Sequence, residues 1–221
     1  MKKIQLLVGL FAIIFISISA FKTAQPASND LTVNSTSIHY LGTPAAEKLH
    51  KDMRKLWEDH ITWTRNVICC FVDGLQGSDH ALRRLMQNQN DIGNAIKPFY
   101  GEDAAKKLTA LLHDHISISA DVVNAAKMGD NNRLAEANKK WTANADEIST
   151  FLTKANPNWK LDEMKHMMHE HLQLTTDEAV ARIKKDYAAD VMAYDKVHNE
   201  ILAMSDMLSD GIIMQFPDKF K

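Results

Sequence analysis

The sequence contains little cysteine, glycine or proline. Its 221 residues include 2 cysteines, 8 glycines and 5 prolines. The two cysteines, Cys69 and Cys70, are adjacent. A bond between neighbours closes a strained ring, so we expect buried thiols rather than a disulfide framework. Scarce glycine and proline beside abundant Ala, Leu, Met, Lys, Asp and Glu predict an all-helical protein that is held together by its core.

The chain also lacks a basic excess and the short motifs of common enzyme classes. Its 26 basic and 28 acidic side chains form no basic stripe, which argues against nucleic acid as a partner. There is no glycine-rich phosphate loop beside a strand, no nucleophile elbow, no Cys-x-x-Cys and no His-Glu-x-x-His. No hydrolase or nucleotide enzyme is indicated. If the chain is an enzyme at all, metal-dependent redox chemistry fits it best.

The first residues have the composition of a secretory signal. Lys2 and Lys3 precede an apolar run over residues 6–21, and small residues follow. The run is short for a membrane span, so we expect cleavage rather than anchoring. This predicts a signal peptide over 1–24, export to the periplasm or the extracellular space, and no membrane association afterwards. Residues 25–43 are polar without helical periodicity, which predicts a flexible tail.

Apolar residues recur at steps of three and four from residue 44 to the end of the chain. This is the spacing of helices that bury one face. It predicts a single helical-bundle domain over 44–221 with up-and-down topology. About six helices are expected, and Pro98 and Gly101 separate the second from the third. The predicted helices begin near residues 44, 78, 102, 131, 162 and 186.

Three similar phrases, "LWEDHITWT", "LLHDHISIS" and "MMHEHLQLT", place an acid–histidine pair inside three of these helices. Their histidines, His60, His115 and His171, are 55 and 56 residues apart, and a hydroxyl residue lies four positions after each. We interpret the pattern as three degenerate helical hairpins that must pack together to bury their apolar faces. Chance similarity among amphipathic helices is the alternative. A further polar residue follows each histidine by 27 to 29 positions: Asn88, Asn144 and His198.

Four histidines and two carboxylates fall on the predicted apolar faces. An imidazole buried without a partner costs free energy, and a metal or a carboxylate is its usual partner. Helical bundles build metal sites from side chains on facing helices. Mixed nitrogen and oxygen ligands suit iron, manganese or zinc. The C-terminal half is rich in methionine, whose thioether also allows copper as the bound metal. We therefore predict a transition-metal site with these ligands: His60, His115, His171, His198, Glu178 and Asp195.

The acids directly before three of the histidines lie about 100° round the helix from them. Asp59, Asp114 and Glu170 are thus expected to accept a hydrogen bond from a histidine on a neighbouring helix, which would fix its tautomer. The alternative is that they line a solvated face. Asn88 and Asn144 are expected to support the ligands as hydrogen-bond donors, or to be core amides satisfied by other helices.

A metal-free hypothesis uses the same residues. The inward histidines, carboxylates and asparagines would then form a hydrogen-bonded network that fixes helix register, in a binding or interaction protein. A metal site predicts that the four histidines converge within a few ångströms, whereas a register network allows them to lie scattered along the bundle. The metal ion is the only partner that the sequence predicts, and the oligomeric state is left open.

Six phrases resemble a family of small exported bacterial all-helical proteins: "LWEDHITWTRNVI", "NQNDIGNAIKPFYG", "LLHDHI", "TANADEI", "AYDKVH" and "LSDGIIMQFPDKF". The resemblance spans roughly residues 50 to 220 and implies an exported helical protein without implying an activity. The chain lacks the ligand order of haemerythrins and the paired Glu-x-x-His of ferritins. Its similarity to those metal-binding bundles is therefore architectural.

Overall fold

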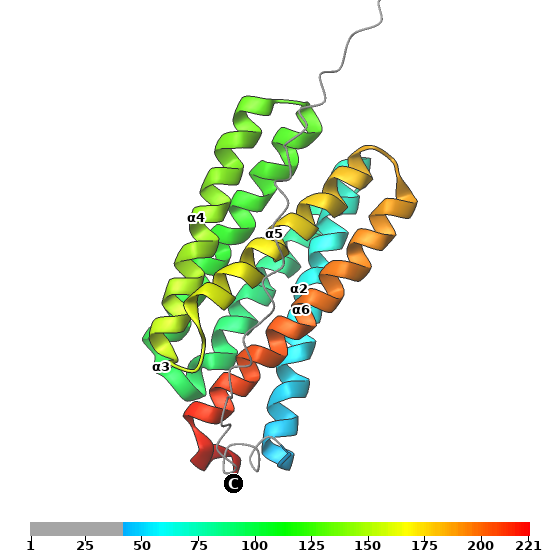
Figure 1. The fold of residues 1–221 in the computed structure, drawn as a ribbon. Helices are drawn as coiled ribbons and strands as arrows, with labels where there is room; N and C mark the ends of the chain where they lie inside the picture. The colour runs from blue at the N-terminus through cyan, green and yellow to red at the C-terminus, as the bar shows by residue number, and fades with distance from the viewer. Residues whose placement is uncertain (1–41) are drawn as a thin grey trace, which may run out of the picture. The chain divides into compact units, whose positions relative to one another are not determined.

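The computed structural model describes residues 42–221, which form an all-helical bundle without strands (Figure 1). This confirms the predicted fold class. The predicted signal peptide and all but the last two residues of the predicted tail lie outside the described residues. Within residues 42–221, no helix combines the length and the hydropathy needed to cross a bilayer. The helices are α2 (Pro44–Asp73), α3 (Ser78–Met128), α4 (Asn131–Ala155), α5 (Leu161–Ile183), α6 (Tyr187–Gln215) and the short 3-10 helix η1 (Pro217–Phe220).

The described residues hold five α-helices rather than six, because α3 joins the second and third predicted helices. Its backbone turns at Gly101, where φ is 83° and ψ is 177°. The two arms of α3, residues 78–100 and 102–128, then lie against each other. A Cβ added to Gly93 in the first arm would lie 1.9 Å from Oγ1 of Thr109 in the second. Gly101 thus permits the turn, and Gly93 permits the close approach of the two arms.

Helices that follow one another in the sequence pack side by side, and the last closes on the first. Helix α3 contacts α2 and α4, α5 contacts α4 and α6, and α6 contacts α2. The three predicted hairpins are therefore α2 with the first arm of α3, the second arm with α4, and α5 with α6. They are not separate units, since α3 belongs to two of them.

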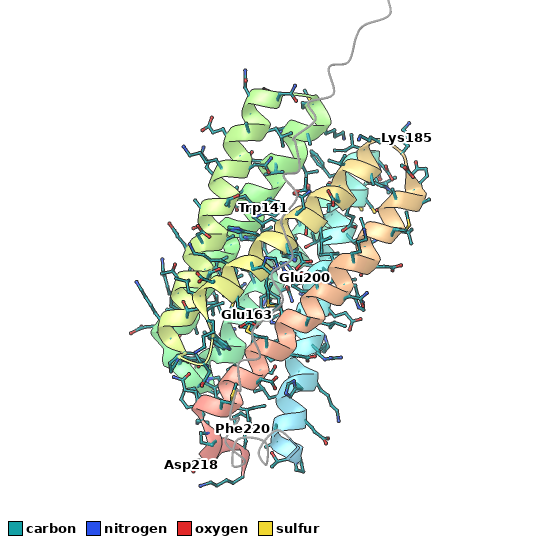
Figure 2. All side chains as sticks on the ribbon, in the orientation of Figure 1. Trp141, Glu163, Lys185, Glu200, Asp218 and Phe220 are labelled. Atoms are coloured by element: carbon teal, nitrogen blue, oxygen red, sulfur yellow. The ribbon has the colours of Figure 1, made fainter. Side chains whose placement is uncertain are left out.

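The core takes aliphatic side chains from every α-helix, and in α6 its buried positions differ from the predicted apolar face. At the chain end, η1 turns Phe220 inward, with its ring centroid 5.8 Å from that of Phe99 (Figure 2). Both cysteines are free, as predicted, and are partly buried. Residues with less than 2% exposure include Leu85, Ile92, Ile148, Met164, Ile201, Met204 and Ile212.

Replacing Gly101 with alanine should destabilise the bundle by about 1–3 kcal/mol, because the φ and ψ of this residue are essentially restricted to glycine. An added Cβ would meet no atom within 4 Å, so the loss would be purely conformational. Urea unfolding followed by circular dichroism measures it. The control is Gly42→Ala, which also meets no atom within 4 Å and has no left-handed φ. Equal stability of the two variants would contradict the role of Gly101.

Candidate histidine centre

Three of the four histidines in the predicted ligand set meet in the middle of the bundle. His60 comes from α2, His115 from the second arm of α3 and His171 from α5, and each is only 3–4% exposed. The ring centroid of His171 is 5.7 Å from that of His60 and 6.3 Å from that of His115. The ring of His171 is thus close to both of the others. We call these three side chains the histidine centre.

Each imidazole is contacted at Nδ1 by a side chain that follows it by 29 residues. The ring of His115 donates to Oδ1 of Asn144 at 2.8 Å, and Asn144 in turn donates to the carbonyl of Leu111 at 3.1 Å. The ring of His171 donates to Oε2 of Glu200 at 3.0 Å, while Oε1 of Glu200 is buried and has no hydrogen bond in the described residues. Figure 2 shows Glu200 at mid-length of α6.

The direction of the hydrogen bond is reversed at His60. Nε2 of Gln89 donates to Nδ1 of His60 at 3.3 Å and to the carbonyl of Leu85 at 2.8 Å. Oε1 of Gln89 is buried without a hydrogen bond in the part of the chain that is described. Asn88 donates to the carbonyl of Leu56, four residues before His60, at 2.9 Å. The first and second copies thus share an asparagine that anchors the helix carrying the histidine.

Burial keeps two of the imidazoles neutral. It lowers the pKa of His115 to about 3 and the pKa of His60 well below its usual value, and the positive charge that His171 carries when protonated adds to both shifts. Because His115 donates through Nδ1, its Nε2 carries a lone pair. A neutral imidazole with a free lone pair is the form that binds metals.

A cavity of about 30 Å³ lies beside the histidine centre and is otherwise lined by core side chains such as Met53, Ile148 and Met204. That volume holds about one or two waters, or a single ion. The His171 ring plane is tilted by 39° from that of His60 and by 30° from that of His115. The rings are thus arranged closer to parallel than to a geometry in which their nitrogens converge on one ion. Across residues 42–221, no group of three or more His, Cys, Asp or Glu side chains already has the spacing of a metal site.

The structure places the other predicted ligands of α6 away from the centre. Nε2 of His198 contacts Oε1 of Glu58 at 3.2 Å on the surface, and Asp195 is exposed. The buried face of α6 runs instead through residues such as Val197 and Ile201, which turns positions 195 and 198 outward. Glu200, two residues further on, takes the position beside the third histidine that we had expected for His198.

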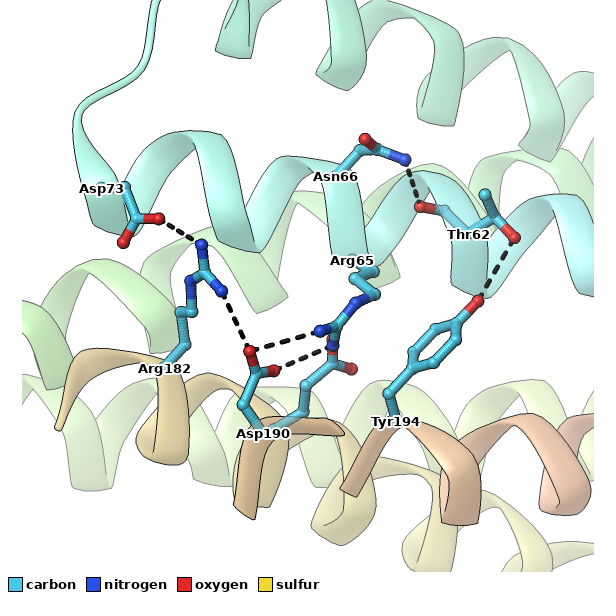
Figure 3. Close-up of polar contacts among 8 residues, drawn as sticks. Thr62, Arg65, Asn66, Asp73, Arg182, Asp190 and Tyr194 are labelled. Atoms are coloured by element: carbon cyan, nitrogen blue, oxygen red, sulfur yellow. Dashed lines mark hydrogen bonds and ion pairs between the residues drawn. The ribbon is translucent and has the colours of Figure 1, made fainter. Parts of the chain in front are cut away.

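Glu178 is buried, as predicted, but its carboxylate pairs with Arg65 instead of a histidine. Figure 3 shows the ion-pair network to which Arg65 belongs, with Asp190, Arg182 and Asp73. Arg65 contacts Glu178 at 2.6 Å and Asp190 at 2.8 Å, and both carboxylates are only 1% exposed. Arg182 contacts Asp190 at 3.1 Å and also pairs with Asp73. Burial raises the pKa of Glu178 to about 7, although the Arg65 guanidinium opposes that shift. The network joins α2, α5 and α6.

The acids that precede the histidines do not support them. Asp59 forms ion pairs with Lys55 at 2.6 Å and Arg84 at 3.6 Å, whereas Asp114 and Glu170 are exposed. The hydrogen bonds to the histidine rings come instead from the side chains that follow each histidine by 29 residues. Two of these, Gln89 and Glu200, were missing from the predicted set. Requiring one constant offset within "NQNDI", "NADEI" and "HNEIL", rather than offsets of 27 to 29, would have identified them.

No family model matches the chain, and neither a curated protein nor a solved structure is significantly similar to it. The resemblance to small exported bacterial proteins therefore stays a prediction.

Replacing Arg65 with leucine should destabilise the protein by about 3 kcal/mol, because it leaves two buried carboxylates without their main partner. The effect should be measured at pH 8, where Glu178 is largely ionised, by urea unfolding. The matched control is Arg54→Leu. It removes an arginine of the same helix that pairs with Asp206 at the surface, and should cost at most about 1 kcal/mol. Equal losses in the two variants would show that the network does not stabilise the bundle.

Proposed function

We propose that the histidine centre binds one transition-metal ion through the Nε2 atoms of His60, His115 and His171. The proposal is supported by three buried imidazoles that share one small cavity, each contacted at Nδ1 by a side chain from another helix segment. Histidines that bind metals are commonly oriented in this way through the second ring nitrogen. Imidazole ligands without a carboxylate favour zinc, copper or iron over manganese.

Metal binding requires two local rearrangements. The three rings must rotate so that their Nε2 atoms face the cavity, and the Gln89 amide must turn to bring its unpartnered Oε1 to Nδ1–H of His60. A side chain displaced from its preferred rotamer costs about 0.5–1.5 kcal/mol. Binding of a structural zinc ion releases about 10–16 kcal/mol. The free energy of binding therefore exceeds the cost of reorganising a few side chains.

We also propose where the protein binds its metal. If the predicted signal peptide directs export, the centre meets its metal in the periplasm or outside the cell. A metal held by three histidines inside an apolar core would be protected from solvent. Storage, sensing and a structural role each fit that position.

A second candidate is a metal-free binding or interaction protein in which the histidine centre only fixes the register of the helices. It is favoured by the ring arrangement, which has no ready ligand geometry, and by the hydrogen bonds at all three Nδ1 atoms. Both candidates require the histidines to be buried, so mutational loss of stability does not separate them. Metal content does.

The decisive experiment measures metal in the protein purified without a histidine tag from metal-replete medium. We expect close to one zinc, copper or iron per chain by plasma mass spectrometry. The His115→Ala/His171→Ala variant should lose it. The matched control is His166→Ala/His169→Ala, which removes two exposed histidines of α5 and should keep the metal.

Because removing two buried side chains can unfold the bundle, circular dichroism must show that the first variant is helical, and single His→Gln variants provide a milder second set. A metal-free parent that gains no thermal stability from added zinc, copper or iron would refute the metal proposal and leave the register network. Equal metal in both double variants would place the site elsewhere.

A further inference from the structure

A second, larger cavity lies on one side of the histidine centre. Its volume is about 440 Å³, and α2, α3, α4 and α5 all contribute to its wall. It lies towards the end of the bundle that carries the α2–α3 and α3–α4 turns, at the top in Figure 1. Trp141 lines this cavity, and its ring centroid is 5.3 Å from that of His115. Trp141 thus contacts both the cavity and the histidine centre.

The wall of this cavity is mainly hydrocarbon. Phe71, Leu82, Ile116, Val122 and Leu134 line it together with other aliphatic side chains. A volume of about 300–1,000 Å³ is usual for sites that bind small organic molecules. Such a lining binds apolar surface by removing it from water, and it offers nothing in exchange for the hydration of a charged group.

Three polar side chains at the histidine end of the cavity come from the repeat; the other polar residues of the wall are Ser78, Asp79, Asp121, Asn124, Asn138 and Thr176. Thr64, Ser119 and Thr175, each four residues after a histidine of the centre, all line it. The hydroxyls of Thr64 and Ser119 donate to carbonyls of their own helices, at 2.8 Å each, and keep acceptor lone pairs. Thr175 is 5% exposed, and its hydroxyl has no hydrogen bond within the described residues. The three hydroxyls therefore offer one free donor and several acceptors to a neutral polar group.

The charged residues of the wall do not favour an anion. Asp79 and Asp121 are the acidic residues of the lining, which contains no lysine or arginine. Asp121 is paired with Arg133 at 2.9 Å, and both side chains are more than half exposed. A carboxylate inside the cavity would meet no cation, so an anionic ligand would lose its hydration without compensation.

We propose that this cavity binds an uncharged, mainly hydrocarbon small molecule that carries a single hydroxyl or carbonyl group. The polar group lies at the hydroxyl of Thr175, and the hydrocarbon part occupies the aliphatic wall between α2, α3 and α4. The proposal does not rest on metal binding, because none of the three histidines belongs to the cavity lining.

The test uses calorimetric titration of the full chain with three probes of equal length: 1-octanol, octanoate and octylammonium. Octanol should bind once per chain and at least tenfold more tightly than either octanoate or octylammonium. Thr175→Val keeps the shape of the side chain and removes its hydroxyl, so it should weaken octanol binding by about fivefold, the loss of one ordinary hydrogen bond.

Filling the cavity provides the matched comparison. Val67→Phe, in the wall, should reduce octanol binding at least tenfold, whereas Val191→Phe, at a 52% exposed position of α6 outside the wall, should not. If Val67→Phe does not fold, Ala120→Phe at an exposed part of the wall replaces it. The proposal is overturned if octanol does not bind saturably, if octanoate binds more tightly, or if both cavity-filling variants bind octanol as the parent does.

Discussion

The burial of three imidazoles in an apolar core is the constraint on which the rest of this structure depends. Each ring must keep a hydrogen-bond partner, because a buried polar group without one costs about 1–3 kcal/mol. The partner always stands 29 residues later, on the helix segment that packs beside the histidine. These three hydrogen bonds therefore fix the axial register of each histidine helix against its partner segment. They also place the three pairs of segments at the same height in the bundle.

The histidine centre also divides the bundle into two regions of different packing. On one side lie aliphatic core residues such as Ile92, Ile148 and Ile201, which are almost fully buried and line the small cavity. On the other side lie the network of Arg65 with its carboxylates, and the large cavity. The two proposed sites are thus separate consequences of one layered arrangement.

The sequence predicted the helical fold, the inward histidines of three helices and the turn at Gly101, because each depends on local periodicity or on a single backbone position. It misplaced His198 and Asp195. Apolar residues surround much of α6, including the exposed Val191 and Met192, so several helical phases fit its sequence. Packing against α2 and α5 determines which face of α6 is buried. Arg65 and Glu178 meet across 113 residues, a pairing that no local pattern specifies.

The most direct test is a nitrogen-15 NMR measurement of the imidazole nitrogens, repeated as zinc is added. Before zinc is added, Nδ1 of His115 should be protonated and its Nε2 should carry a lone pair. One equivalent of zinc should then shift the Nε2 signals of His60, His115 and His171 together. Three histidines that respond independently, or a protonated Nε2 on His115 with no response to zinc, would contradict the shared centre that binds metal.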